Sequence, residues 1–213
     1  MVAGLEWNFR IMKAFSQPRT LFRRRKQVEA DIASALRALR EGATIGLHLG
    51  AGTSRIEGMI NCDLYNPNAD RKVDATSLDG FENLSVDLIE HHHMIEHLSF
   101  DDFRRAVSEW HRVLKEGGHL VFTCPDIARI CRRYLLLKVR GYLSDQSKET
   151  DYAIKMIVGS QEHEGMFHKN HFDPSRVRRI FPMHGFKVEY ITAYPRRPTP
   201  SMLVIARKAS GRN

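Results

Sequence analysis

Hydrophobic positions within residues 1–40 recur at the spacing of an amphipathic helix. The side chains at this spacing are Leu21, Phe22, Val28, Ile32, Leu36 and Leu39. A repeat of three to four residues gives a helix one apolar face. We therefore expect an N-terminal helix that Gly42 ends, before a first strand that opens at Ile45.

Beyond Gly42 the pattern changes to short apolar runs, which predict buried strands at residues 45–49, 59–63, 86–89 and 119–123. Before the last of these runs, Ser99 and Asp102 form a capping box that opens a helix. Its apolar face comprises Phe103, Ala106, Val107, Trp110, Val113 and Leu114. We expect Gly117 and Gly118 to stop this helix. Strands that alternate with a helix in this way predict βαβ units and a parallel sheet.

A glycine turn lies between the first two predicted strands. The first strand runs into Gly50-Ala51-Gly52, and the second ends in the acid Asp63. Glycines let the backbone approach a ligand closely, and a carboxylate can accept both hydroxyls of a ribose, so this order predicts an adenosine-bearing cofactor. Only six residues, TSRIEG, separate Gly52 from Met59. A parallel crossover usually needs a dozen or more residues, so either a short turn replaces the usual helix or the two strands are not neighbours.

Composition narrows the class of protein. The chain of 213 residues suits one elaborated α/β domain, contains no apolar run long enough to span a membrane, and begins without a signal-peptide pattern. Three cysteines are too few for a disulfide framework, and we expect a cytoplasmic protein.

Charge is unevenly distributed along the chain. The net charge is +6 over residues 1–40, −7 over 41–125 and +9 over 126–213. Basic flanks attract phosphate-bearing partners, such as a nucleotide-sugar, an anionic lipid or a nucleic acid, although a solvated basic surface explains them equally well. In the N-terminal helix, Glu29 and Asp31 favour packing over peripheral contact with a membrane.

Two segments carry a family resemblance. VDLIEHHHMIEHLSFDDFRRAVSEWHRVLKEGGHLVFTCPD resembles the middle of class I S-adenosylmethionine-dependent methyltransferases, and HFDPSRVRRIFPMHGFKVEYI resembles their last helix, Gly-Phe turn and sixth strand. The pattern G-x-x-N-x-D after the glycine turn is similar to that of a small subgroup associated with cell-surface polysaccharide and sugar methylation.

The resemblance implies an α/β fold with a Rossmann-like, mostly parallel seven-stranded sheet, an antiparallel last strand at 202–207 and a shortened first crossover. It divides the chain into a basic helical extension at residues 1–42 and a methyltransferase domain at 43–213, with a substrate-side insertion at 126–171 after the fifth strand.

The resemblance also implies S-adenosylmethionine as the cofactor and assigns residues to it. The cofactor-binding residues would be Gly50, Ala51, Gly52, Asp63, Leu64, Asp74, Ala75, His91 and His92. In the family pattern the glycine turn lies beside the methionine part of the cofactor, and Asp63 binds the ribose hydroxyls. Asp74 and Ala75 would recognise the amino group of the adenine. His91 and His92 would face the sulfonium end.

The substrate side is expected to supply a base. Methyl transfer to a hydroxyl requires a group that takes its proton, and histidine suits neutral pH. The catalytic candidates are His92, His168 and His171, with His163 and Glu164 nearby in the insertion and Asp126 at its start. The basic insertion predicts a small, anionic acceptor such as a sugar or another phosphate-bearing metabolite.

Other functions compete with this interpretation. His93-Met-Ile-Glu-His97 has the H-x-x-E-H pattern of inverted zinc peptidases, but it leaves room for one helical turn and singles out no third ligand, so we expect no metal site. A nucleic-acid methyltransferase fits the charge, yet Cys124-Pro125-Asp126 stands where base amino-methylating relatives carry Asn/Asp-Pro-Pro-Tyr. A cofactor-binding module without activity is a third alternative. The sequence does not predict the oligomeric state.

Overall fold

The computed structural model describes residues 23–141, 147–194 and 200–210, which fall into two compact units, Met1–Ala43 and Thr44–Asn213. In the first unit, α2 (Arg23–Gly42) ends at Gly42, as predicted. Ile32, Leu36 and Leu39 are buried, whereas Leu21 and Phe22 lie outside the described residues. The predicted helix is therefore confirmed over its second half.

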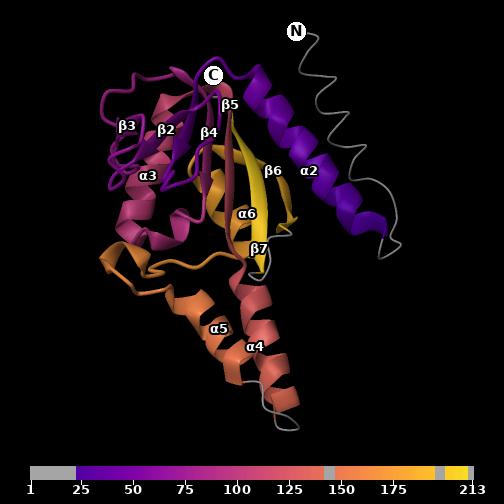
Figure 1. The fold of residues 1–213 in the computed structure, drawn as a ribbon. Coiled ribbons are helices and arrows are strands. Elements are labelled where there is room, and N and C mark those ends of the chain that lie inside the picture. Colours follow the sequence, from indigo (N-terminus) through magenta and orange to yellow (C-terminus); the bar gives the residue numbers. More distant parts are fainter. Residues whose placement is uncertain (1–22, 142–146, 195–199, 211–213) are drawn as a thin grey trace. The chain divides into compact units, whose positions relative to one another are not determined.

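The second unit is built on one seven-stranded sheet with the order β3-β2-β1-β4-β5-β7-β6 (Figure 1). The strands are β1 (Gly46–Leu49), β2 (Ile60–Asp63), β3 (Arg71–Lys72), β4 (Val86–His92), β5 (Leu114–Pro125), β6 (Phe186–Tyr194) and β7 (Ser201–Lys208). Pairing is parallel from β3 to β5, and β7 runs antiparallel to both β5 and β6. This confirms the Rossmann-like sheet with an antiparallel last strand.

The first crossover is short, and it still joins neighbouring parallel strands. β1 pairs with β2 in parallel, with Leu47 opposite Ile60 and Leu49 opposite Cys62. The connecting residues 50–59, all of which the structure describes, contain turns and no helix. Of the two alternatives left open by the sequence, a turn in place of the usual helix is the correct one.

The hydrophobic core lies on the sheet face that α3 (Phe100–Val113) and α6 (Pro174–Met183) cover. Trp110 of α3 and Phe181 of α6 are fully buried, and the Phe181 ring stacks on Phe122 of β5 at 5.1 Å between centroids. The predicted cap is present, because Ser99 Oγ accepts a hydrogen bond from the backbone N of Asp102. Alternation along the strands turns the other side chains to the opposite face of the sheet.

The end of α3 differs from the sequence prediction. The helix stops at Val113, and Leu114 already belongs to β5, whereas Gly117 and Gly118 turn the chain inside the residues of that strand. Buried Lys208 of β7 donates from Nζ to the carbonyl oxygens of His111 (2.8 Å) and Leu114 (3.0 Å). The Lys208 ammonium thus supplies hydrogen-bond donors to carbonyl oxygens at the end of the helix, which otherwise lack partners. The helix can therefore end four residues before the position of Gly117.

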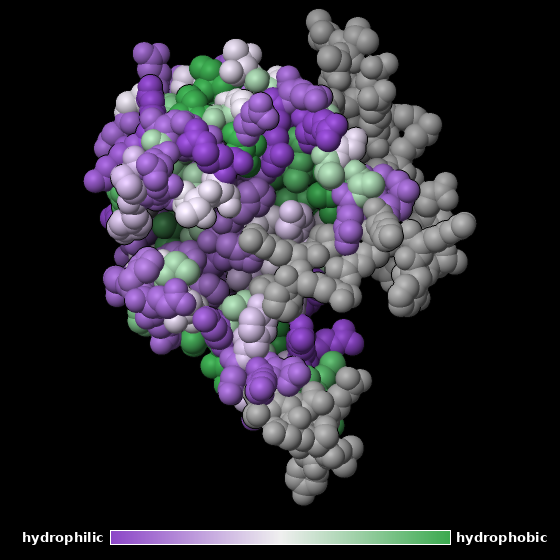
Figure 2. Space-filling model, viewed as in Figure 1, coloured by the Kyte–Doolittle hydropathy of each residue, from purple (hydrophilic) through white to green (hydrophobic). Residues whose placement is uncertain are grey.

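The insertion after β5 contains α4 (Ile127–Gly141) and α5 (Ser147–Val158), which lie side by side beyond the carboxyl end of β5 (Figure 1). Two short helical turns lie in separate loops, η1 (Ile95–His97) after β4 and η2 (Glu164–Met166) in the insertion. Hydrophilic residues dominate the face seen in Figure 2, with hydrophobic ones scattered among them. Among the described residues, no helix is long and apolar enough to cross a membrane.

Candidate active site

The predicted site residues converge on the carboxyl edge of the sheet. The glycine turn follows β1, Asp63 and Leu64 lie at the end of β2, and His91 and His92 end β4. Parallel strands bring all of these ends to one edge, which is where open α/β sheets bind their ligands. The insertion begins at the same edge because α4 directly follows β5.

The glycine turn leaves room beside the backbone. Gly50 and Gly52 have φ angles of +61° and +51°, a left-handed conformation that favours glycine. A Cβ added to Gly50 would approach Met94 Cγ to 2.6 Å, whereas one added to Gly52 would meet nothing within 4 Å. The turn thus needs glycine for its conformation, and at Gly52 it borders open space that a bound ligand could fill.

Asp63 connects this turn to the loop after β2. One carboxylate oxygen accepts the backbone N–H of Gly52 at 2.7 Å, and the other accepts those of Tyr65 and Asn66, each at 2.8 Å. Burial acts to raise the pKa of Asp63, but the donors from Asn66, Gly52 and Tyr65, together with the field of His48, lower it overall. The carboxylate therefore stays ionised while it shapes the edge of the site.

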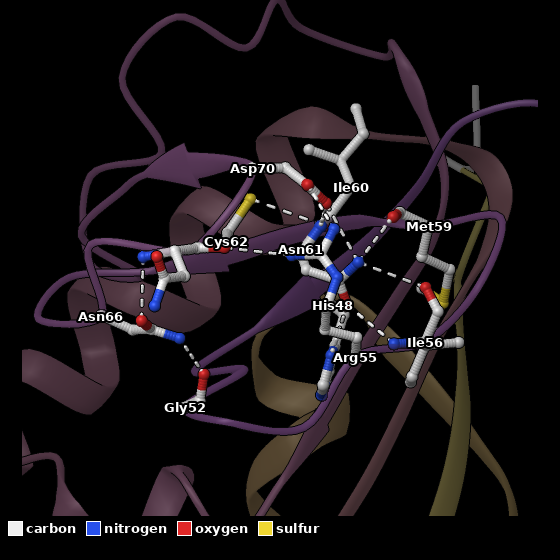
Figure 3. Close-up of polar contacts among 11 residues, drawn as sticks. His48, Gly52, Arg55, Ile56, Met59, Ile60, Asn61, Cys62, Asn66 and Asp70 are labelled. Carbon is white, nitrogen blue, oxygen red and sulfur yellow. Dashed lines mark hydrogen bonds and ion pairs between the residues drawn. The ribbon is translucent and has the colours of Figure 1, made fainter.

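Asn61 holds the short crossover in place, as Figure 3 shows. Its Nδ2 donates to the carbonyl oxygens of Met59 (2.9 Å) and Ile56 (3.2 Å), and its Oδ1 accepts the backbone N–H of Ile56 at 2.8 Å. Asp70 Oδ2 in turn accepts the backbone N–H of Asn61 at 2.8 Å. These bonds fix the chain that a helix would otherwise organise. Asn61 is the asparagine of the G-x-x-N-x-D pattern, for which the sequence alone predicted no structural role.

The remaining predicted cofactor residues lie around the loop after β2 and β3. Asp74 is exposed, and its carboxylate accepts hydrogen bonds from the backbone N and the hydroxyl of Thr76, at 2.8 and 2.7 Å. The Ala75 carbonyl accepts the indole N–H of Trp110 at 3.0 Å, which ties this loop to α3. Leu64 is half-buried directly after Asp63.

His91 and His92 point to opposite faces of the sheet. The ring of His91 is fully buried, stacked on Phe122 at 5.1 Å and tilted against Trp110 at 5.0 Å, and neither of its nitrogens has a hydrogen-bond partner among the described residues. Burial lowers the pKa of His91 well below its usual value, and the neighbouring His92, His48 and His93 add to this while Glu90 opposes it. In this arrangement His91 is a neutral core residue.

His92 belongs to a row of polar side chains on the opposite face. Its Nε2 lies 2.8 Å from Oε1 of the fully buried Glu90, and its Nδ1 lies 3.0 Å from Thr123 Oγ1. His48 of β1 continues the row, with its ring 5.9 Å from that of His92 and its Nδ1 3.0 Å from Asn61 Oδ1. Glu90, Thr123 and His48 were not among the sequence candidates. Their polar side chains at alternate positions of apolar strands could have revealed them.

The insertion loop carries the other predicted histidines to this edge. His168 Nδ1 lies 3.0 Å from the carbonyl oxygen of Met156, and His171 Nε2 lies 2.7 Å from that of Ile157, so both rings fasten the loop to α5. Burial lowers the pKa of His168, Glu96 raises it, and His97 lowers it further. His163 accepts the backbone N–H of Gly165 and caps η2, and Glu164 pairs with Lys169 at 2.8 Å.

The H-x-x-E-H segment is not helical. His93 has a φ of +51°, and the only helical turn is η1, which spans three residues. The imidazoles of His93 and His97 therefore do not share one helix face, as an inverted zinc peptidase requires. Glu96 Oε1 lies 2.9 Å from His93 Nδ1.

Asp126 closes the edge at the end of β5. It is 3 % exposed, and burial raises the pKa of its carboxyl, opposed by the backbone N–H and the charge of Arg129. Its backbone pairs with Phe172, so the end of the insertion returns to the start.

Comparison with known proteins identifies the domain. Residues 47–122 match the family described as a methyltransferase domain, from β1 into β5. Residues 47–122 therefore carry a methyltransferase domain. The match covers the glycine turn, Asp63 and the end of β4, and S-adenosylmethionine is the cofactor of this methyltransferase. No curated protein matches the chain.

Solved structures share the fold of the methyltransferase at low sequence identity. An S-adenosylmethionine-dependent methyltransferase from Mesorhizobium loti is 19 % identical, with a TM-score of 0.52 over 82 % of this chain and 96 % of its own. One from Methanosarcina mazei is 16 % identical, with a TM-score of 0.51 over 78 % and 92 %. The 1,6-didemethyltoxoflavin-N1-methyltransferase of Burkholderia thailandensis, solved with bound 1,6-didemethyltoxoflavin and S-adenosylhomocysteine, is 13 % identical, with a TM-score of 0.53 over 91 % of this chain and 93 % of its own.

Proposed function

We propose that the methyltransferase transfers a methyl group from S-adenosylmethionine to a hydroxyl of a sugar or of another small phosphate-bearing metabolite in the cytoplasm. Gly50, Ala51, Gly52, Asp63, Leu64, Asp74 and Ala75 would hold the cofactor. The open space beside Gly52 and the ionised carboxylate of Asp63 at its border support this assignment. The cofactor supplies a methyl group on a positively charged sulfur, so the enzyme needs to position the acceptor in line with it and to remove one proton.

The pairing of His92 with buried Glu90 is the observation that carries the proposal. The last register pair of β1 and β4 is Leu49–His91, and His92 and Gly50 are the residues that directly follow these two partners. With Nε2–H donating to Glu90, the lone pair of His92 is on Nδ1, which lies 3.0 Å from the Thr123 hydroxyl. An acceptor hydroxyl would take the place of the Thr123 hydroxyl at Nδ1 and give its proton to this nitrogen. The Glu90 carboxylate would stabilise the resulting imidazolium, as a carboxylate does beside a catalytic histidine. His168 and His171 would act from the insertion, where their rings position the loop.

The charge of the insertion supports an anionic acceptor. Arg129, Arg132, Arg133 and Lys138 are exposed on α4, which starts at the carboxyl edge of the sheet. Cations beside a ligand-binding edge raise the local concentration of phosphate-bearing molecules. The loop from Gly159 to Phe172 completes this side, because the backbone N–H groups of Lys169 and Asn170 donate to the Glu96 carbonyl at 2.9 and 3.0 Å.

Calorimetry with S-adenosylmethionine and S-adenosylhomocysteine tests the proposal first. We expect both to bind one site per chain, and binding of neither would overturn the proposed function. Turnover would then be measured with sugar phosphates, nucleotide-sugars and their unphosphorylated analogues. Methylation of RNA or DNA, with affinity that falls steeply as salt rises, would instead identify a nucleic-acid methyltransferase.

A further inference from the structure

Glu96, His97 and His168 come together where η1 meets the insertion loop. Each offers one ligand atom, and these three atoms all lie within 4.8 Å of one another. The imidazole rings of His97 and His168 meet edge to face, with centroids 5.0 Å apart. One carboxylate and two imidazoles form a donor set that binds Zn²⁺ in proteins. The sequence predicted no metal site, because His168 is distant along the chain.

Both histidines are oriented through their other ring nitrogen. His97 Nδ1 lies 3.1 Å from the carbonyl oxygen of Phe167, and His168 Nδ1 lies 3.0 Å from that of Met156. A carbonyl only accepts hydrogen bonds, so each Nδ1 carries the proton and each Nε2 keeps its lone pair. Neither Nε2 has a hydrogen-bond partner in the described part of the chain. Metal-bound histidines usually donate their second N–H to a backbone carbonyl in this way.

Glu96 provides the independent observation. Glu96 is 2 % exposed, and its Oε1 accepts a hydrogen bond from His93 Nδ1 at 2.9 Å. Its Oε2 is buried and has no hydrogen-bond partner among the described residues. A buried carboxylate oxygen without a partner costs free energy, which a cation would remove. His93 takes the position of a supporting group that orients the ligating carboxylate. His168 thus replaces His93 in the donor set that the H-x-x-E-H pattern suggested.

We propose that Glu96, His97 and His168 bind a divalent transition metal of the Zn²⁺ type. Zn–N distances of 2.0–2.1 Å place tetrahedral ligand atoms about 3.3 Å apart, so side-chain rotation needs to bring them closer by roughly 1.5 Å at most. Three protein ligands leave the fourth position open, as in catalytic zinc sites. There the metal binds an anionic oxygen of the acceptor, a role that rests on the proposed function, whereas metal binding itself does not.

Titration of the full-length, chelator-treated protein with Zn²⁺ tests the site by calorimetry, and the visible spectrum of added Co²⁺ reports the geometry. We expect one metal per chain and the intense absorption of tetrahedral Co²⁺. Each of His97→Ala, His168→Ala and Glu96→Gln should weaken Zn²⁺ binding at least about tenfold. His184→Ala removes a histidine outside the cluster, at the end of α6, and should bind Zn²⁺ as the wild type does. Circular dichroism verifies that each variant is folded.

The metal site would be overturned if the wild type bound no stoichiometric Zn²⁺. It would also be overturned if folded His97→Ala and His168→Ala variants bound Zn²⁺ as tightly as the wild type. The affinity for S-adenosylhomocysteine, measured on the same samples, separates the two proposals. A wild-type protein that binds Zn²⁺ but no S-adenosylhomocysteine keeps the metal site and loses the proposed function. Cofactor binding without Zn²⁺ binding gives the reverse result.

Discussion

At the scale of single residues, Asp63 joins structure to the proposed cofactor site. It accepts the backbone N–H groups of Gly52, Tyr65 and Asn66, so the same carboxylate fixes the glycine turn and borders the space beside Gly52. An ionised carboxylate accepts hydrogen bonds only, which suits both backbone N–H groups and ribose hydroxyls.

Asp63→Ala should weaken binding of S-adenosylhomocysteine by about tenfold to a hundredfold, because a hydrogen bond to a charged group contributes about 1.5–3 kcal/mol. Calorimetry measures this affinity directly. Asp101→Ala is the matched control, since its side chain is 82 % exposed on α3. Full retention of affinity in Asp63→Ala would contradict the ribose assignment.

His91 provides a pH-dependent prediction. Its pKa is lowered in the fold by burial and by the neighbouring histidines, so below about pH 6.5 the unfolded chain takes up a proton that the folded chain refuses. The free energy of unfolding is therefore unaffected by this histidine above pH 6.5 and falls as the pH is lowered below it. The loss reaches at most about 1.4 kcal/mol per pH unit.

His91→Leu should abolish this part of the pH dependence and should be at least as stable as the wild type at pH 7, because it removes two buried nitrogens without partners. Urea unfolding between pH 5 and 8 measures both effects. Unchanged affinity for S-adenosylhomocysteine would agree with the core position of His91. A large loss would support the role in cofactor binding that the sequence suggested.

At the scale of elements, the crossover from β1 to β2 depends on polar bonds rather than on a helix. Asn61 bridges it to β2, and Arg55 pairs with Asp70 across the same connection. Polar side-chain bonds therefore hold the short connection between the paired strands β1 and β2.

Asn61→Ala should lower the free energy of unfolding by about 2 kcal/mol, since it removes the partners of the half-buried N–H of Ile56 and of the buried carbonyl of Met59. It should also weaken cofactor binding, because the connection it anchors begins with the glycine turn. Asn83→Ala offers a control, as Asn83 has an exposed side-chain bond to Arg112 in a surface loop. Equal losses in both variants would argue against a specific role for Asn61.

Element prediction worked where the signal was local. The capping box and the apolar face of α3 were visible in the sequence and are present in the structure. The end of that helix was wrong by four residues, because Lys208, about ninety residues later, satisfies the last carbonyls. The glycines alone could not predict this end, because the Lys208 side chain that binds the last carbonyls comes from a strand of the sheet.

At the scale of the whole molecule, several carboxylates stabilise the fold in their ionised form. Hydrogen bonds from Ser99 lower the pKa of Asp102, and the bond from His119 lowers that of Glu189. Burial raises the pKa of Asp87, but Lys115 and the backbone N–H of Ile45 outweigh it and lower the value. These carboxylates lie in α3, β4 and β6, so protonation in acid weakens contacts in several parts of the fold.

The free energy of unfolding should therefore fall as the pH drops below about 4, where the unfolded chain binds protons before the folded carboxylates do. The contribution is fully present above that pH and disappears toward the lowered pKa values. Urea unfolding at pH 5, 4 and 3 measures it. Asp102→Asn should make the decline shallower and Asp101→Asn should not, whereas a flat profile in the wild type would refute the argument.

The sequence by itself determined the α/β class of the fold, the glycine turn and Asp63, because hydrophobic spacing and turn residues act over short distances. Only the tertiary structure decided the remaining features. Strand register placed Thr123 of β5 beside His92, and packing enclosed the His91 ring between Phe122 and Trp110. The insertion brought His168 to Glu96 and His97. Contacts between residues distant in sequence depend on how strands align and loops return, which no local pattern encodes.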